Sequence, residues 1–145
     1  MNHDASPISV SILGTGVDIV ETARIQGSLD QFGERFLRRC FWPDEVAYCN
    51  SMKFPALHFA ARFAAKEAIS KAFGTGIGRQ LGWTDMEIRK HGNGAPYVVF
   101  HGRGAELAKN RGATEVFVSL SHCKEYAAAH AVLVGQGPPS ARASQ

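Results

Sequence analysis

Cysteine is scarce in this sequence, and long apolar runs are missing. The 145 residues include three cysteines, and these form no Cys-x-x-Cys motif. Their number and spacing argue against a zinc site and favour a reducing compartment. No apolar run approaches the roughly 20 residues that cross a bilayer, and the first ten residues lack the basic and apolar regions of a secretory signal. We therefore expect a cytoplasmic protein that does not bind a membrane.

Several nucleotide-binding and hydrolase motifs are also missing, although the sequence contains 15 glycines. A dinucleotide fingerprint would need a third glycine where Ile19 or Arg79 stands. No glycine cluster ends in the Gly-Lys-Ser/Thr of a Walker loop. Ser119 and Ser121 do not lie in a Gly-x-Ser-x-Gly nucleophile motif. The glycines must therefore serve another purpose.

Neither sign of charge dominates the chain. The net charge is +3, and charged residues make up 20% of the sequence, which is typical of one globular domain. Nucleic-acid binding usually needs a stronger basic excess and aromatics placed for stacking, so we do not expect it. One alternative is a non-catalytic basic module that binds acidic proteins through Arg24, Arg35, Arg38 and Arg39.

The hydrophobic patterns predict an α+β fold, with an antiparallel sheet packed on one long helix. A single domain is expected over residues 1–145, with a loose leader at 1–7 and a disordered tail at 135–145. The alanines at 127–129 also fit a helix, and the choice of a strand over 126–134 follows from the family resemblance described below. The predicted helices cover 19–29, 30–39, 43–50, 55–73 and 104–110, and the predicted strands cover 8–17, 83–89, 97–100, 115–121 and 126–134.

The segment 62–78, RFAAKEAISKAFGTGIG, places charges on a helix that ends in a glycine cluster. Glu67 and Lys71 are four residues apart, so their side chains are neighbours on one helix face. Gly74 and the glycines after it would let backbone approach a ligand closely. The combination suits a metal-bound phosphate. The alternative is an ordinary ion pair followed by a glycine C-cap.

A second segment, GTGVDIVETARI at 14–25, places Asp18 at the end of a predicted strand. Glu21 follows three residues later, where a helix could begin. The Asp-x-x-Glu spacing is typical of a capping box with Asp18 as the N-cap. Glu21 and Arg24 could also form an i,i+3 pair. The residues alone leave the metal-binding and capping roles of Asp18 open.

Four segments in order resemble one family, the small bacterial 4′-phosphopantetheinyl transferases known as holo-acyl-carrier-protein synthases. The resemblance runs over about residues 10–134. The segments are Gly16-x-Asp18-x-x-Glu21 with Arg24-Ile25; Arg62 to Ala68 with Lys71 to Gly78; Asn93-Gly94-x-Pro96; and Ser119 to Ala127. The resemblance implies the phosphopantetheinyl transferase fold.

The resemblance also implies an activity. The family transfers the 4′-phosphopantetheine arm of coenzyme A to a serine of apo acyl carrier protein, which supports fatty acid biosynthesis, and it releases adenosine 3′,5′-bisphosphate. Asp18 and Glu67 correspond to its Mg²⁺ ligands, and Asp18, Glu67 and Lys71 to its catalytic residues. Mg²⁺ commonly takes one or two carboxylates and completes its shell with phosphate oxygens and water. The general base would be Glu67 or a metal-bound water.

Further contacts follow from the same resemblance. Carrier protein is expected to dock on the helix that begins near Ile19, with Arg24 as its main anchor. The family forms homotrimers with active sites between subunits. The expected coenzyme A-binding residues are Arg62, Lys71, Gly74, Asn93, Pro96 and His122.

Overall fold

A computed structural model describes residues 10–136. The predicted leader at 1–7 and residues 137–145 of the predicted tail lie outside this range, whereas Gly135 ends a strand. The elements are β1 (Ser11–Glu21), α1 (Thr22–Phe32), α2 (Glu34–Cys40), α3 (Pro43–Asn50), α4 (Pro55–Ala72), a 3₁₀ turn (Trp83–Asp85), β2 (Met86–Lys90), β3 (Pro96–Phe100), α5 (Gly102–Asn110), β4 (Ala113–His122) and β5 (Tyr126–Gly135).

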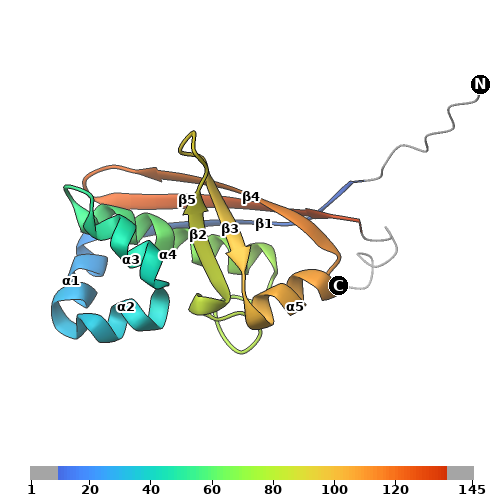
Figure 1. Cartoon of the computed structure of the whole chain (residues 1–145). Coiled ribbons are helices and arrows are strands. Elements are labelled where there is room, and N and C mark those ends of the chain that lie inside the picture. The colour runs from blue at the N-terminus through green and yellow to red at the C-terminus, as the bar shows by residue number, and fades with distance from the viewer. Residues whose placement is uncertain (1–9, 137–145) are drawn as a thin grey trace, which may run out of the picture.

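An antiparallel sheet of order β1-β5-β4 forms one layer, and α4 packs along one face of it (Figure 1). The alanine-rich segment is the central strand β5, as predicted, because its small side chains alternate between the two faces. The members of β5 that turn toward α4 are buried: Ala127, Ala129, Ala131 and Leu133. The predicted layout, an antiparallel sheet packed on one long helix, is confirmed.

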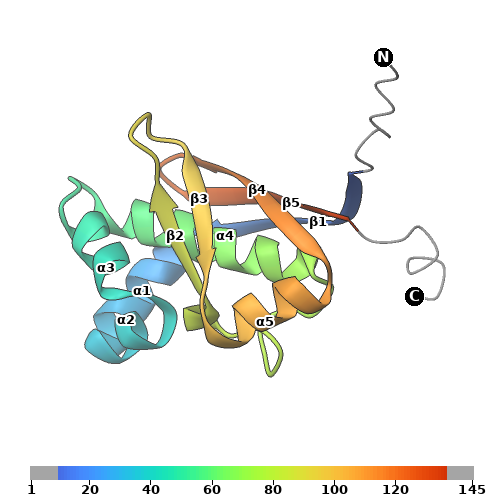
Figure 2. The same cartoon turned by 45° about the vertical axis from the view of Figure 1, so that its right-hand side comes forward.

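The second layer contains a hairpin of β2 and β3, which crosses in front of α4 (Figure 2). Gly94 turns the hairpin at φ 88°, in the left-handed region that favours glycine. The strand predicted over 83–89 begins only at Met86, because residues 83–85 form a 3₁₀ turn. Within that turn the Trp83 ring stacks on Phe63, with ring centroids 4.4 Å apart.

Helices α1, α2 and α3 form a corner at one end of α4 (Figure 1). Gly33, at φ 50°, separates α1 from α2, so the boundary between the two helices predicted for this segment lies three to four residues later than expected. None of the helices within residues 10–136 is long and apolar enough to cross a membrane.

A buried ion pair joins this corner to the rest of the core. The Lys66 Nζ lies 2.7 Å from Glu45 Oε1, both side chains are fully buried, and the ammonium also donates to the Cys40 carbonyl at 2.6 Å. The Glu45 carboxylate accepts from the backbone N–H groups of Trp42 (2.9 Å) and Ile88 (3.1 Å). One carboxylate therefore links α3 to α4 and β2.

Candidate active site

The site begins where β1 and α4 touch. A Cβ added to Gly14 would lie 1.9 Å from the Ala72 carbonyl oxygen, and one added to Gly16 would lie 1.9 Å from that of Ala68. Only glycine permits this approach of strand and helix backbones. The sequence predicted these glycines at the end of a strand, but they lie inside β1. Two residues beyond Gly16, Asp18 points to the same face of the strand, toward α4.

The capping role considered for Asp18 is wrong. β1 continues through Asp18, which pairs with Ala129, and ends at Glu21 opposite Tyr126. The helix predicted to begin near Ile19 therefore begins at Thr22, and its N-cap residue Glu21 forms no side-chain capping bond. Pairing with β5 prevails over the local Asp-x-x-Glu signal, since it satisfies the backbone groups that a helix would otherwise need to cap.

Asp18, Glu67 and Lys71 come together at the contact of β1 with α4. The Lys71 Nζ lies 3.1 Å from Asp18 Oδ1 and 3.0 Å from the Val17 carbonyl oxygen. Burial raises the pKa of Glu67, and the neighbouring Asp18 charge raises it further, against the opposing effect of Lys71. Two carboxylates that repel each other beside a single ammonium form a donor set that suits a divalent cation.

The two carboxylates would act as an incomplete set of metal ligands. Between Val10 and Gln136 no three His, Cys, Asp or Glu residues lie close enough to hold a metal ion together. Mg²⁺ does not need such a cluster, because it is commonly held by one or two carboxylates plus substrate phosphates and water. The donors of Asp18 and Glu67 therefore fit Mg²⁺, and they do not form the closed cage of a structural metal site.

The glycines after α4 form a tight backbone turn. Gly74 has φ 77° and Gly76 has φ 64°, both in the left-handed region. The N–H groups of Thr75 and Gly76 donate back to the Ser70 carbonyl at 3.1 and 3.2 Å. A Cβ on Gly74 would meet no atom within 4 Å, so this backbone is open to a ligand. The predicted contact of Gly74 with a phosphate stays a prediction.

A second group of predicted residues lies in a cavity of about 130 Å³ between α4, the β2–β3 hairpin and β4. Arg62, Pro96 and His122 line it, as do His58 and Lys90. These residues come from four separate segments, so the fold gathers most of the predicted nucleotide-binding residues at one place. All the ionisable groups in this lining are basic, which makes the cavity a candidate anion site.

Asn93 does not line this cavity in a single chain. Its side-chain oxygen accepts a hydrogen bond from the Ala95 N–H at 3.0 Å, and it is exposed in the hairpin turn. The turn role of Asn-Gly explains that contact. Binding of coenzyme A by Asn93 therefore stays a prediction that the single chain does not support by proximity.

Arg62 is the most unusual member of the cavity. It is 3% exposed, and among the residues described its buried Nε has no hydrogen-bond partner. Its guanidinium lies 4.2 Å from the centre of the Tyr48 ring, in a cation–π contact. A buried guanidinium nitrogen left unpaired is costly. An anion in the cavity would satisfy it.

The two groups of residues lie on different sides of α4. Glu67 and Lys71 are four residues apart and project within about 40° of each other, whereas Arg62 and Glu67 are five apart and project about 140° apart. One chain therefore holds the Asp18 group and the Arg62 group on separate sides of α4. Their separation bears directly on how a complete site could form.

Two residues that line the cavity, His58 and Lys90, and Tyr48 beside it were not singled out from the sequence. Tyr48 and Lys90 are 42 residues apart, so no short motif connects them, yet the Lys90 Nζ donates to the Tyr48 hydroxyl at 2.6 Å. His58 lies one helical turn before Arg62, a spacing that could have indicated a shared face. Burial and the nearby His122 hold the pKa of His58 below its ordinary 6.5.

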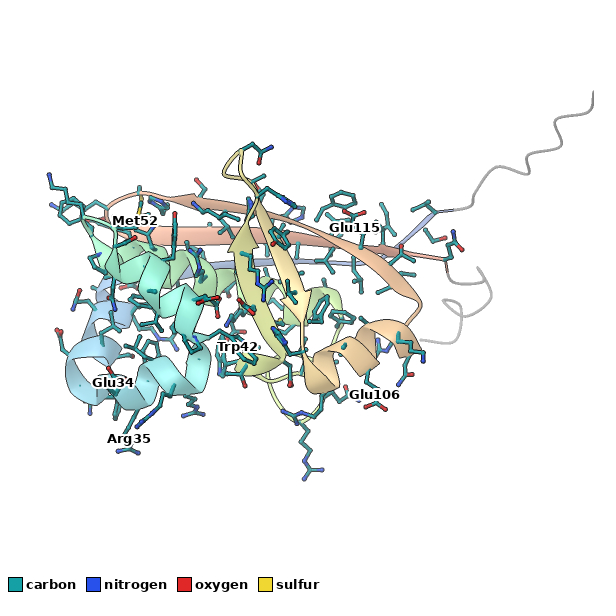
Figure 3. All side chains as sticks on the ribbon, in the orientation of Figure 1. Glu34, Arg35, Trp42, Met52, Glu106 and Glu115 are labelled. Atoms are coloured by element: carbon teal, nitrogen blue, oxygen red, sulfur yellow. The ribbon has the colours of Figure 1, made fainter. Side chains whose placement is uncertain are left out.

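Arg24 lies beside a different cavity, of about 360 Å³, between α1, α2 and α4. Arg35 and Arg39 also line it, and the Arg24 guanidinium lies 5.9 Å from the centre of the Phe63 ring. Figure 3 shows Glu34 and Arg35 at the end of the helical corner, away from the sheet. A cavity with three arginines around apolar side chains suits an acidic, amphipathic protein surface.

Comparison with known proteins gives consistent matches. A family model described as the 4′-phosphopantetheinyl transferase superfamily matches residues 14–131. A holo-[acyl-carrier-protein] synthase of Koribacter versatilis is 47% identical over 122 residues, which cover 84% of this chain and 98% of the relative. One of Protochlamydia amoebophila is 46% identical, over 83% of this chain and 96% of the relative.

Solved structures agree with this match. A holo-[acyl-carrier-protein] synthase of Neisseria meningitidis has a TM-score of 0.80 at 31% identity, covering 85% of this chain and 98% of that one. The Helicobacter pylori enzyme in complex with coenzyme A has a TM-score of 0.74 at 33% identity, covering 82% and 98%. Sequence and fold both match over nearly the whole length of these relatives, so the chain belongs to the 4′-phosphopantetheinyl transferase superfamily, and the family, fold and enzyme class predicted from its sequence are confirmed.

Proposed function

We propose that this protein is a cytoplasmic holo-acyl-carrier-protein synthase. It transfers the 4′-phosphopantetheine arm of coenzyme A to a serine of apo acyl carrier protein and releases adenosine 3′,5′-bisphosphate, in support of fatty acid biosynthesis. The observation that carries the proposal is the convergence of Asp18, Glu67 and Lys71 at the contact of β1 with α4. The names of the relatives and the coenzyme A complex of a structural neighbour support it.

In this proposal Asp18 and Glu67 would hold Mg²⁺, and the bound ion would supply positive charge against the pyrophosphate of coenzyme A. Lys71 contacts the same phosphates, because its ammonium already lies beside Asp18 and is half exposed. The serine oxygen of the carrier protein forms a bond to the β-phosphorus, and the bond from that phosphorus to the leaving bisphosphate breaks. The serine proton passes to the Glu67 carboxylate or to a water that the metal would hold.

The Arg62 cavity binds the far end of the nucleotide. Arg62 and His122 contact the 3′-phosphate, while Pro96 and Asn93 border the adenosine. The basic lining and the unpaired Arg62 Nε support this assignment. Gly74 borders the phosphates at the other end, where Lys71 lies, because the absence of a side chain leaves open space beside its backbone.

A complete site then needs two chains, which we propose are neighbours in a homotrimer. The sheet face turned away from α4 exposes large apolar side chains at Val17 (63%), Ile19 (67%) and Phe117 (55%). Burying such a face between copies is favourable. The separation of the Asp18 group and the Arg62 group around α4 supports a site in which these are two half-sites, one chain contributing Asp18 and its neighbour contributing Arg62.

Mixing two inactive variants tests the shared site. Asp18→Ala removes one half-site and His122→Ala the other, so hybrid oligomers would contain some sites with both halves intact. We expect each variant alone to be inactive and the mixture to recover part of the activity after subunit exchange. Transfer to carrier protein measures the recovery, and exchange is confirmed by mass spectrometry of differently tagged subunits. Absence of recovery after confirmed exchange would count against a shared site.

Arg24 is proposed as the main anchor for the acidic carrier protein. It lies in the first turns of α1, next to the cavity that Arg35 and Arg39 also line. Complementary charge mainly raises the rate of encounter, and salt screens exposed charges over about 10 Å at 0.1 M. The contact should therefore matter most at low ionic strength.

Arg24→Glu is expected to lower kcat/KM for carrier protein roughly tenfold at low salt and much less at high salt, because the repulsion it introduces is screened. Steady-state kinetics at several salt concentrations measure this, and KM for coenzyme A should stay unchanged. Lys109→Glu on α5 serves as a control with the same charge reversal outside the Arg24 cavity. An unchanged rate for Arg24→Glu at low salt would remove Arg24 from the docking surface.

The direct test of the proposed function uses purified components. The protein is mixed with apo carrier protein, coenzyme A and Mg²⁺, and the carrier is weighed by mass spectrometry. The expected result is a carrier heavier by one phosphopantetheine group, and no gain without Mg²⁺. Binding of the carrier without any mass change would instead favour the non-catalytic module that binds acidic proteins.

A further inference from the structure

Tyr48 forms contacts with three basic side chains of the Arg62 cavity. Its ring centre lies 4.2 Å from the Arg62 guanidinium and 4.8 Å from the Lys90 Nζ. Its hydroxyl accepts a hydrogen bond from that same Lys90 Nζ at 2.6 Å. The His58 ring meets it edge-on, with centroids 6.0 Å apart. Among residues 10–136, no other aromatic ring lies against both an arginine and a lysine.

We propose that Lys90 is a further ligand of the terminal phosphate of coenzyme A, and that Tyr48 is the positioning residue that holds Lys90 and Arg62 toward it. This inference rests on the proposed function, because it assumes that the cavity takes the phosphate end of the nucleotide. Lys90 is otherwise exposed on the last residue of β2, where a lysine has many conformers. Contacts with the ring and hydroxyl of Tyr48 hold the Lys90 side chain in one of these conformers.

The cavity contains a surplus of positive charge that needs an anion. Arg62 and Lys90 are cations, and His58 and His122 lie beside them with ring centroids 5.2 Å apart. Among the described residues that line the cavity, none is acidic. Packing two cations against one ring brings like charges together, which is unfavourable without a counter-charge. The electron-rich ring face offsets only part of that repulsion.

The chemistry favours a phosphate monoester over a diester. A phosphate monoester carries between one and a half and two charges at neutral pH, and offers three acceptor oxygens. Coenzyme A has one such group, the 3′-phosphate, whereas its pyrophosphate is a double ester. A cavity of about 130 Å³ is far smaller than the several hundred Å³ of typical pockets for whole ligands. It suits one phosphoryl group and leaves the base and ribose outside.

The test compares ligands that differ by that single phosphate. Binding of adenosine 3′,5′-bisphosphate and of adenosine 5′-monophosphate is measured by calorimetry, and KM is measured for coenzyme A and 3′-dephospho-coenzyme A. Lys90→Met should weaken binding of the bisphosphate about tenfold, since a hydrogen bond to a charged group is lost. Binding of the monophosphate should change less than about twofold. Lys109→Met on α5 is the matched control and should change neither.

Tyr48 is tested with two variants. Tyr48→Phe keeps the ring but removes the acceptor of Lys90, so we expect bisphosphate binding about threefold weaker. In a Lys90→Met background, Tyr48→Phe should weaken bisphosphate binding no further. If Tyr48 served only the stability of the fold, its substitution would weaken binding in that background too. Tyr48→Leu also removes the ring contact with Arg62, and should weaken binding at least as much as Lys90→Met. Thermal unfolding of Tyr48→Phe should match that of the wild type.

The outcomes separate this inference from the proposed function. Equal losses for bisphosphate and monophosphate in Lys90→Met, or no loss at all, would overturn the role of Lys90. Additive effects of Tyr48→Phe and Lys90→Met would overturn the positioning role of Tyr48. If the wild type fails to modify carrier protein, the proposed function fails, and the calorimetric comparison still decides whether this cavity binds the 3′-phosphate.

Discussion

Asp18→Asn is expected to reduce phosphopantetheine transfer roughly a hundredfold or more while the protein stays folded. The amide keeps the size and one oxygen of the side chain but loses the charge that would hold Mg²⁺. Asp18 lies within β1, where its backbone pairs with Ala129 of β5, and it has no capping role, so the substitution removes no helix cap. The substitution also removes the repulsion between the Asp18 and Glu67 carboxylates, because the Asp18 charge contributes to the raised pKa of Glu67.

The measurement is the initial rate of transfer over a series of Mg²⁺ concentrations. Asp18→Asn should shift the curve to far higher Mg²⁺ and lower its plateau, and Glu67→Gln should do the same. Glu106→Gln is the control, because Glu106 is exposed on α5 and the substitution removes a carboxylate outside both the metal site and the Arg24 surface. Near-normal Mg²⁺-dependent transfer by Asp18→Asn would show that Asp18 is not a metal ligand.

Asp18 is a residue whose structural role the local sequence pattern does not predict correctly. Glycines, an aspartate and a glutamate three residues later are local signals for a strand end and a helix cap. The structure carries the strand four residues further, because pairing with β5 satisfies the backbone through Glu21. Tertiary pairing thus prevails over the local pattern. The bounds of the long helix α4, in contrast, were predicted within one residue from its apolar face and from Pro55 at its start.

The candidate site was predictable only in parts. Glu67 and Lys71 are neighbours on one helix, and their periodicity indicated a shared face before the fold was known. Tyr48 and Lys90 lie on α3 and β2, and only the packing of the hairpin over α4 joins them. No spacing within the sequence encodes that contact. The family resemblance supplied Arg62 and His122, whereas residue chemistry alone would have left them as a solvated arginine and a turn histidine.

The core contains a buried ion pair that the composition of the chain does not predict. Lys66 interrupts the apolar residues of α4, yet it is fully buried and opposes Glu45 at 2.7 Å. Burial lowers the pKa of Lys66, and the attraction of Glu45 works against that effect. The pair also satisfies the Cys40 carbonyl and, through Glu45, two backbone N–H groups. Each partner is therefore the buried counter-charge of the other.

Lys66→Met is expected to lower the free energy of unfolding by about 3–5 kcal/mol, because it leaves the Glu45 carboxylate buried without its counter-charge. Lys66→Met combined with Glu45→Gln should cost less than Lys66→Met alone. The neutral amide needs no cation, and its oxygen can still accept from the Trp42 N–H, the present partner of Glu45 Oε1. Lys71→Met makes the same change on the same helix, but its pair with Asp18 is half exposed on the lysine side, so we expect about 1 kcal/mol or less.

Urea unfolding at fixed protomer concentration measures these differences, since association with other copies would shift the apparent midpoint. The comparison depends on burial alone: the two lysines share a helix and a substitution, and they differ in whether water can replace the lost partner. If Lys66→Met costs no more than Lys71→Met, or if adding Glu45→Gln deepens the loss, then Glu45 does not depend on Lys66, and the ion pair does not hold the helical corner to α4.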